Sequence, residues 1–104
     1  MAINSCNSHI FHLELKLMNI KKTRENLLFS IEKLKSWKKV LLDKHKEDSD
    51  EFVKLMEVMT QCVNCLSNVT SVCEKSYDYY FANKIDIAEL DRQANEYIEL
   101  VVRM

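Results

Sequence analysis

Apolar side chains recur at alternating intervals of three and four residues along most of this 104-residue chain. The first such stripe covers ten positions, eight of them apolar: Ile10, Leu13, Leu17, Ile20, Arg24, Leu27, Ile31, Leu34, Lys38 and Leu41. A period of 3.5 residues keeps one face of a helix against a partner helix. We therefore predict a first helix over about residues 9–43. The polar run at residues 21–26 could form a solvated turn that splits the helix in two. We favour one continuous helix, because the stripe keeps its phase across the run.

A second helix is predicted after the polar segment 43–50, which has no apolar residue and suits a turn. Asp48 is followed three residues later by Glu51, a spacing that resembles a capping box and predicts a helix start. We expect this helix to span residues 49–81. Its stripe consists of Phe52, Leu55, Met59, Cys62, Leu66, Val69, Cys73, Ser76 and Tyr80, widened by Met56, Val63 and Tyr77.

A shorter third helix is predicted over residues 87–103. Asn83 is the best local candidate for a helix stop, and Asp86 with Glu89 forms a second capping signal. The stripe of the third helix contains Ile87, Leu90, Ala94, Tyr97, Val101 and Met104. The predicted fold is therefore all-α: a long antiparallel helical hairpin with a shorter third helix, forming a three-helix bundle or coiled-coil-like domain that a dimer could complete.

Composition agrees with a single helical domain over residues 1–104. The chain has no glycine, which supplies positive φ in tight hairpins, and no proline, which breaks helices. It is 47% apolar and 30% charged, too hydrophobic for a disordered chain. No apolar stretch approaches the length of a membrane span, and residues 1–8 lack the layout of a signal peptide. We expect a cytoplasmic protein, although a leaderless route of secretion stays open.

The net charge is −1, but the two halves of the chain differ in sign. Residues 1–46 carry ten Lys or Arg against four Asp or Glu, whereas residues 47–104 carry five against twelve. A basic first helix beside acidic later helices favours internal pairing of charge over nucleic-acid binding. The lysines around Trp37 leave one alternative function open, a basic helix that binds nucleic acid or an anionic membrane.

The unequal lengths of the helices suggest a candidate binding surface. At 1.5 Å per residue the first two helices would each span roughly 50 Å and the third only about 27 Å. With the predicted turn near residues 45 and 46, the third helix should cover residues 10–27 and 62–80 and leave the turn-proximal half uncovered. Uncovered apolar surface marks interaction sites. The predicted partner-binding residues are Leu27, Leu28, Ile31, Leu34, Trp37, Leu41, Phe52, Leu55, Met56 and Met59.

The cysteines are the most reactive side chains in the sequence. Cys62 and Cys65 match the C-x-x-C spacing of redox and zinc sites, but they lie in the middle of a predicted helix, and the third helix offers no Cys or His as a further ligand. Cys62 and Cys73 fall on the stripe, where a free cysteine packs as a small hydrophobe. We predict no metal site, no cofactor and no catalytic residue.

The sequence therefore predicts a non-enzymatic protein-interaction module, an adaptor, chaperone or inhibitor. It would bind a partner helix, or a second copy of itself, through the turn-proximal half of the hairpin. Besides the basic-helix alternative, a secreted helical cytokine-like factor is a third possibility that would need paired cysteines. No sequence motif identifies a known family.

Overall fold

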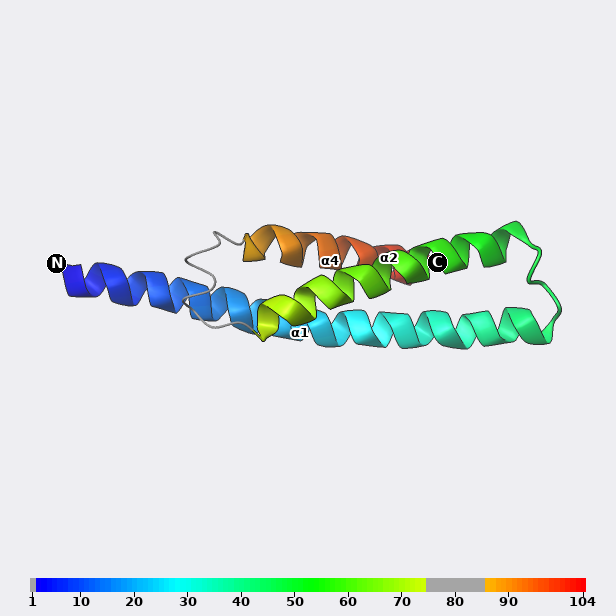
Figure 1. The fold of residues 1–104 in the computed structure, drawn as a ribbon, viewed down its shortest axis with the longest axis horizontal. Coiled ribbons are helices and arrows are strands. Elements are labelled where there is room, and N and C mark those ends of the chain that lie inside the picture. Colours follow the sequence, from blue (N-terminus) through cyan, green and yellow to red (C-terminus); the bar gives the residue numbers. More distant parts are fainter. Residues whose placement is uncertain (1, 75–85) are drawn as a thin grey trace.

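The computed structural model describes residues 2–74 and 86–104, with side chains described from residue 11 onward in these ranges. The described residues form helices α1 (Ala2–Asp43), α2 (Asp50–Cys73) and α4 (Ile87–Arg103), without any strand. α1 and α2 form an antiparallel hairpin, and α4 runs back alongside it in the direction of α1 (Figure 1). All three pairs of these helices are in contact. The predicted all-α three-helix bundle is confirmed.

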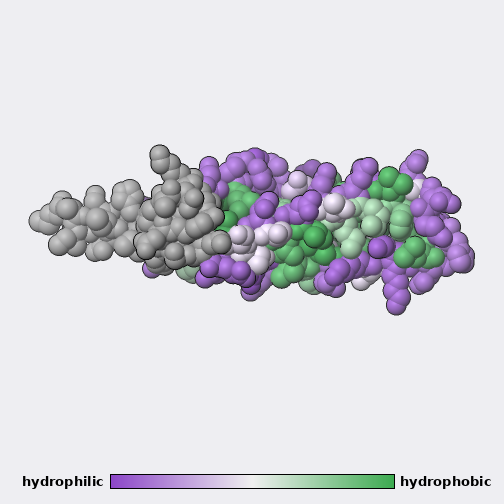
Figure 2. Space-filling view, in the orientation of Figure 1, coloured by the Kyte–Doolittle hydropathy of each residue, from purple (hydrophilic) through white to green (hydrophobic). Residues whose placement is uncertain are grey.

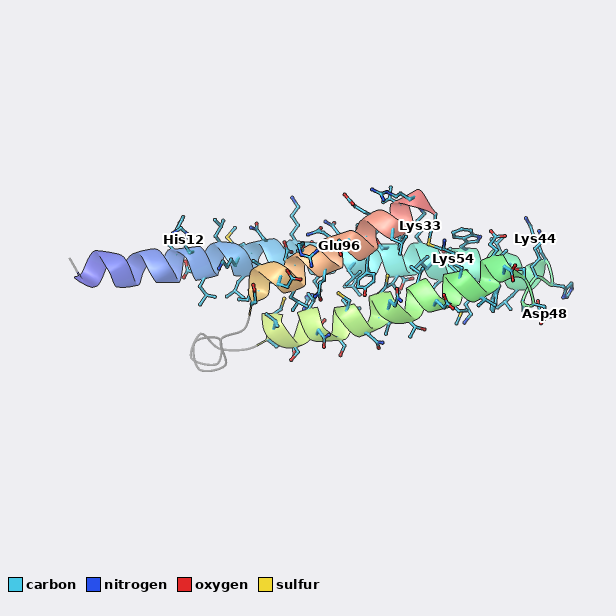
Figure 3. The ribbon with its side chains drawn as sticks, turned by 90° about the horizontal axis from the view of Figure 1, so that it is seen from above. His12, Lys33, Lys44, Asp48, Lys54 and Glu96 are labelled. Atoms are coloured by element: carbon cyan, nitrogen blue, oxygen red, sulfur yellow. The ribbon has the colours of Figure 1, made fainter. Side chains whose placement is uncertain are left out.

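α1 sets the length of the molecule. Its 42 residues correspond to about 63 Å at 1.5 Å per residue, close to the longest extent of 65 Å. α1 is therefore continuous through the polar run at residues 21–26, which is the favoured alternative, and it begins at Ala2 rather than near residue 9. Its N-terminal part extends beyond the ends of α2 and α4 (Figure 1), and His12 lies on this projecting part (Figure 3).

α1 ends in a left-handed turn formed without glycine. His45 has a φ of 55°. Its N–H donates to the carbonyl of Leu42 (3.0 Å), and the N–H of Lys46 donates to the carbonyl of Leu41 (2.9 Å). This pair of hydrogen bonds is the Schellman motif, which satisfies carbonyl groups that the last helical turn would leave unpaired. The sharp reversal into α2 therefore depends on a non-glycine residue in a left-handed conformation.

The starts of α2 and α4 are capped by side chains. The N-cap of α2 is Ser49, whose Oγ accepts a hydrogen bond from the Phe52 N–H (3.2 Å) and donates one to the Lys46 carbonyl (2.6 Å). The predicted N-cap at Asp48 is therefore wrong by one residue. The hydroxyl of Ser49 can both accept and donate a hydrogen bond, so it links the turn to the start of α2. The predicted cap of α4 is confirmed: the Glu89 N–H donates to Asp86 Oδ1 (3.0 Å).

The core runs along the seam between the three helices. Its buried apolar residues are Leu17, Ile20, Leu27, Ile31, Leu34, Leu41, Leu55, Val58, Cys62, Cys65, Val69, Val72, Ile87, Ala94 and Val101. The α1 and α4 members all lie on the predicted stripes, so the phase of both helices is confirmed.

Two predictions about the second helix are corrected. α2 ends at Cys73, with Glu74 as its C-cap, rather than at residue 81. The predicted stripe positions beyond this point, and the predicted stop at Asn83, lie outside the described residues. The α2 stripe also widens on the opposite flank from the predicted one, because Val58, Cys65 and Val72 are buried, whereas Val63 is 45% exposed.

The position of α4 explains the second correction. Lys16, Asn19 and Ile87 border one small cavity, and Trp37, Lys54 and Met104 border another. α4 therefore runs from the level of Lys16 to that of Trp37, about six to ten residues nearer to the turn than predicted. The described helix α2 is shorter than predicted, so α4 enters the bundle further along α1. It then covers the flank of α2 that carries Lys54 and, one turn later, Val58.

Candidate functional site

The ten predicted partner-binding residues are divided by the fold into two groups. Five are buried in the core and take part in the contacts between the helices: Leu27, Ile31, Leu34, Leu41 and Leu55. The other five reach the surface: Leu28 is 43% exposed, and Trp37, Phe52, Met56 and Met59 are half-buried. The predicted surface therefore does not exist as one continuous face of the hairpin, because α4 covers much of the turn-proximal half.

Two adjoining open hollows with mainly apolar surface remain on the outer side of α2, in the half nearest the turn. One hollow of about 570 Å³ is lined by Glu47, Phe52, Val53, Met56, Glu57, Thr60 and Gln61. A second hollow of about 200 Å³ is lined by Met56, Met59, Thr60, Val63 and Asn64. The two hollows share Met56 and Thr60, so they form one depression, which we call the α2 groove. Three of the predicted residues, Phe52, Met56 and Met59, line it.

The side chains of the α2 groove suit an apolar partner. Valine is an aliphatic residue that is usually buried, yet Val53 is 51% exposed and Val63 is 45% exposed. Methionine has a flexible, polarisable side chain that adapts to different apolar surfaces, and Met56 lies at the centre of the groove. Figure 2 shows that apolar patches reach the surface between hydrophilic side chains along the molecule. Exposed apolar side chains that gather around a hollow are a common feature of interaction sites.

The rim of the α2 groove is acidic. Glu47 and Glu57 line it, and no Lys or Arg occurs among the described residues that border either hollow. A partner that places basic side chains beside its apolar face would therefore meet complementary charge. This acidic rim was not predicted as part of the site, although the acidic balance of the second half of the chain was visible in the sequence.

Sequence reasoning missed a second apolar surface, on the outer side of α1. Phe11 is 61% exposed, Leu15 45%, Met18 67% and Phe29 77%. These residues follow the same alternation of three and four as the core stripe, but roughly half a turn away around the helix. The signal was therefore present in the sequence. The second stripe was overlooked because the longer apolar stripe on the opposite face is sufficient to predict the helix.

The cysteines of α2 are placed for packing. Cys62 and Cys65 are buried and free, and Cys73 is half-buried and free. Burial, with a smaller contribution from neighbouring Cys65, raises the pKa of Cys62 to about 11. Burial also raises the pKa of Cys65 and of Cys73, the latter against the opposing charges of Arg24 and Lys21. A raised pKa disfavours the thiolate, which is the nucleophilic and metal-binding form.

The surface of α4 carries a charged cluster that stabilises its own helix. Arg92 pairs with Glu89 one turn before it and with Glu96 one turn after it. The hydrogen bond from Arg92 lowers the pKa of Glu89. All three side chains are exposed and are spaced three or four residues apart, as in pairs that support an isolated helix. This cluster therefore gives α4 local stability rather than a binding site.

The described part of the chain has neither a cluster of metal ligands nor a helix of membrane-spanning character. No group of three or more His, Cys, Asp or Glu side chains there could hold a metal ion. Of the helices that the structure describes, none is long and apolar enough to cross a membrane. The side chains of Cys6 and His9 lie outside the described residues.

Comparison of the chain with protein families, with curated proteins and with solved structures finds no match.

Proposed function

We propose that this protein is a non-enzymatic interaction module that binds a basic amphipathic helix of a partner protein in the α2 groove. One observation carries the proposal: two open, mainly apolar hollows meet at Met56, expose Val53 and Val63, and are bordered by Glu47 and Glu57. Binding of a helix by its apolar face in a hydrophobic groove is a common mode of recognition.

The groove is long enough for such a partner. It extends from Glu47, in the turn, to Asn64, in the second half of α2. The helical part of this stretch, from Asp50 to Asn64, corresponds to about 20 Å at 1.5 Å per residue. About four turns of a bound helix could lie along it. The acidic rim favours lysine or arginine beside the apolar stripe of that helix, and the attraction should weaken with salt.

The test uses two synthetic helical peptides of equal length with the same apolar stripe, one flanked by lysine and the other by glutamate. We expect the wild-type chain to bind the lysine peptide and to bind the glutamate peptide at least about tenfold more weakly, as like charges across an interface are unfavourable. Fluorescence anisotropy of labelled peptides measures both affinities.

Met56→Lys tests whether binding occurs in the groove, and Val102→Lys is the matched control. Val102 is 71% exposed on α4, so its replacement makes the same apolar-to-basic change away from the groove. We expect Met56→Lys to weaken binding of the lysine peptide at least about tenfold and Val102→Lys to leave it unchanged. The proposal is overturned if the wild type does not bind the lysine peptide, or if the two variants bind it equally.

A further inference from the structure

The outer face of α1 carries a second stripe with heptad spacing, separate from the α2 groove. We call it the outer α1 stripe, and it consists of Phe11, Leu15, Met18, Lys22, Glu25 and Phe29. The intervals are four, three, four, three and four, which is the spacing of the a and d positions of a coiled coil. All six side chains are exposed. Four are large and apolar, so this face has the pattern of a helix interface without a partner in the monomer.

From this stripe we propose that two copies of the chain associate through their α1 helices, packed antiparallel about a two-fold axis between residues 23 and 24. Because a two-fold interface uses the same surface of both copies, the stripe must complement itself. In this register Met18 of one copy faces Phe29 of the second copy, whereas Leu15 and Phe11, towards the ends of the interface, face Glu32 and Ser36. Lys22 of one copy faces Glu25 of the second copy, and each of these contacts occurs twice.

The two charged positions select the orientation. In a parallel pair, each stripe residue would face its own copy, so Lys22 would meet Lys22 and Glu25 would meet Glu25. Like charges at directly facing positions are unfavourable. In the antiparallel register, Lys22 and Glu25 of one copy instead each face a residue of opposite charge in the second copy. Polar residues at single seam positions of coiled coils specify register and orientation in this way, at some cost in stability.

The shape of the molecule permits this packing. α1 is continuous over 42 residues, and the proposed axis lies close to its midpoint, so the four central stripe positions, from Met18 to Phe29, can meet their counterparts in the second copy. The stripe lies roughly half a turn away from the core residues that α2 and α4 cover. The N-terminal part of α1, which carries Phe11, projects beyond the ends of α2 and α4 (Figure 1).

Charge reversal tests the register, with sedimentation over a concentration series as the measurement. Lys22→Glu and Glu25→Lys each replace the two opposite-charge contacts by two like-charge contacts. We expect each single variant to raise the Kd of self-association at least about tenfold. The double variant Lys22→Glu with Glu25→Lys restores opposite charges, and we expect it to associate as the wild type does. Lys44→Glu, in the exposed turn, is the control for the change in net charge.

Phe29→Ser tests the apolar part of the interface. Phe29 is 77% exposed in the monomer, so its replacement should keep the helical circular dichroism signal while weakening self-association at least about tenfold. Met56→Lys, in the α2 groove, should leave self-association unchanged, which separates this inference from the proposed function. A strictly monomeric wild type overturns the inference, and so does a dimer that withstands both single reversals. Single reversals that are not rescued by the double variant overturn the antiparallel register.

Discussion

At the scale of single residues, Leu27 and Leu28 show how the fold treats identical side chains differently. They are neighbours in α1, yet Leu27 is fully buried and Leu28 is 43% exposed. A step of one residue turns a helix by about 100°, which moves a side chain out of the core stripe. The sequence pattern placed Leu27 on the stripe correctly. It did not show that Leu27 would be unavailable to a partner, since that depends on the packing of α2 and α4.

Replacing each of these leucines by alanine should separate core from surface. We expect Leu27→Ala to lower the free energy of unfolding by about 2–5 kcal/mol, because it removes buried methyl groups and leaves a cavity. Leu28→Ala should lower it by less than about 1 kcal/mol, because this side chain is only partly removed from water. Urea unfolding followed by circular dichroism measures both values. Equal losses would contradict the burial of Leu27.

The buried thiol of Cys62 should make stability depend on alkaline pH. Its pKa is raised from 9.0 to about 11 in the fold, so the native state favours the protonated thiol more than the unfolded state does. This contribution is fully present below pH 9 and is lost as the pH rises towards 11. We expect the urea midpoint of the wild type to fall more steeply over this range than that of Cys62→Ala. Parallel slopes would show that Cys62 does not carry the effect.

At the scale of elements, the ends of the helices differ in how well local sequence predicts them. The cap at Asp86 is predicted correctly because carboxylate side chains favour this position strongly. The cap of α2 is placed one residue too early, because Asp48 and Ser49 are both good N-cap residues. The end of α1 at Asp43 is predicted correctly from the polar segment 43–50. The left-handed position at His45 has no sequence signal, since the chain has no glycine to mark it.

His45→Gly tests the strained end of α1. A left-handed conformation costs a non-glycine residue roughly 1–2 kcal/mol, and glycine at this position would avoid that cost. Part of the resulting stabilisation is offset, because glycine has greater conformational freedom in the unfolded chain. We expect the substitution to stabilise the protein by about 0.5–1 kcal/mol, measured by thermal unfolding. Lys44→Gly, one residue earlier and without a positive φ, is the control. It should be neutral or destabilising, and a similar gain from both variants would contradict the assignment.

At the scale of the whole molecule, the position of α4 decides which surfaces are free. It was expected to stop near Leu27, but its last residues lie beside Trp37, Glu51 and Lys54. As a result the turn-proximal half of the hairpin is partly covered, and apolar surface remains on the outer sides of α2 and α1 instead. The α2 groove lies on the flank of α2 that α4 leaves free, whereas the outer α1 stripe lies on the face opposite the core and is exposed wherever α4 lies along the hairpin.

The fluorescence of Trp37 should report the docking of α4. Leu100 and Met104 border the same cavity as Trp37, so removing residues 100–104 should expose the indole to water and shift its emission to longer wavelength. Val102→Ser, at a position that is 71% exposed, should leave the emission unchanged. An unchanged spectrum in the truncated chain would place the end of α4 away from Trp37, in agreement with the sequence-based prediction that the third helix covers residues 10–27.

The sequence by itself determined the all-α fold, the phase of α1 and α4 and the packing role of Cys62. These properties follow from local periodicity and from the absence of glycine and proline, which act within a few residues along the chain. Only the tertiary structure decided where α4 lies along the hairpin, and hence whether Val58 is buried and Val63 exposed. Helices with heptad stripes can slide by whole heptads without changing which face is apolar. The register is therefore fixed by the connections between helices and the fit of the core as a whole, rather than by the pattern of any one stripe.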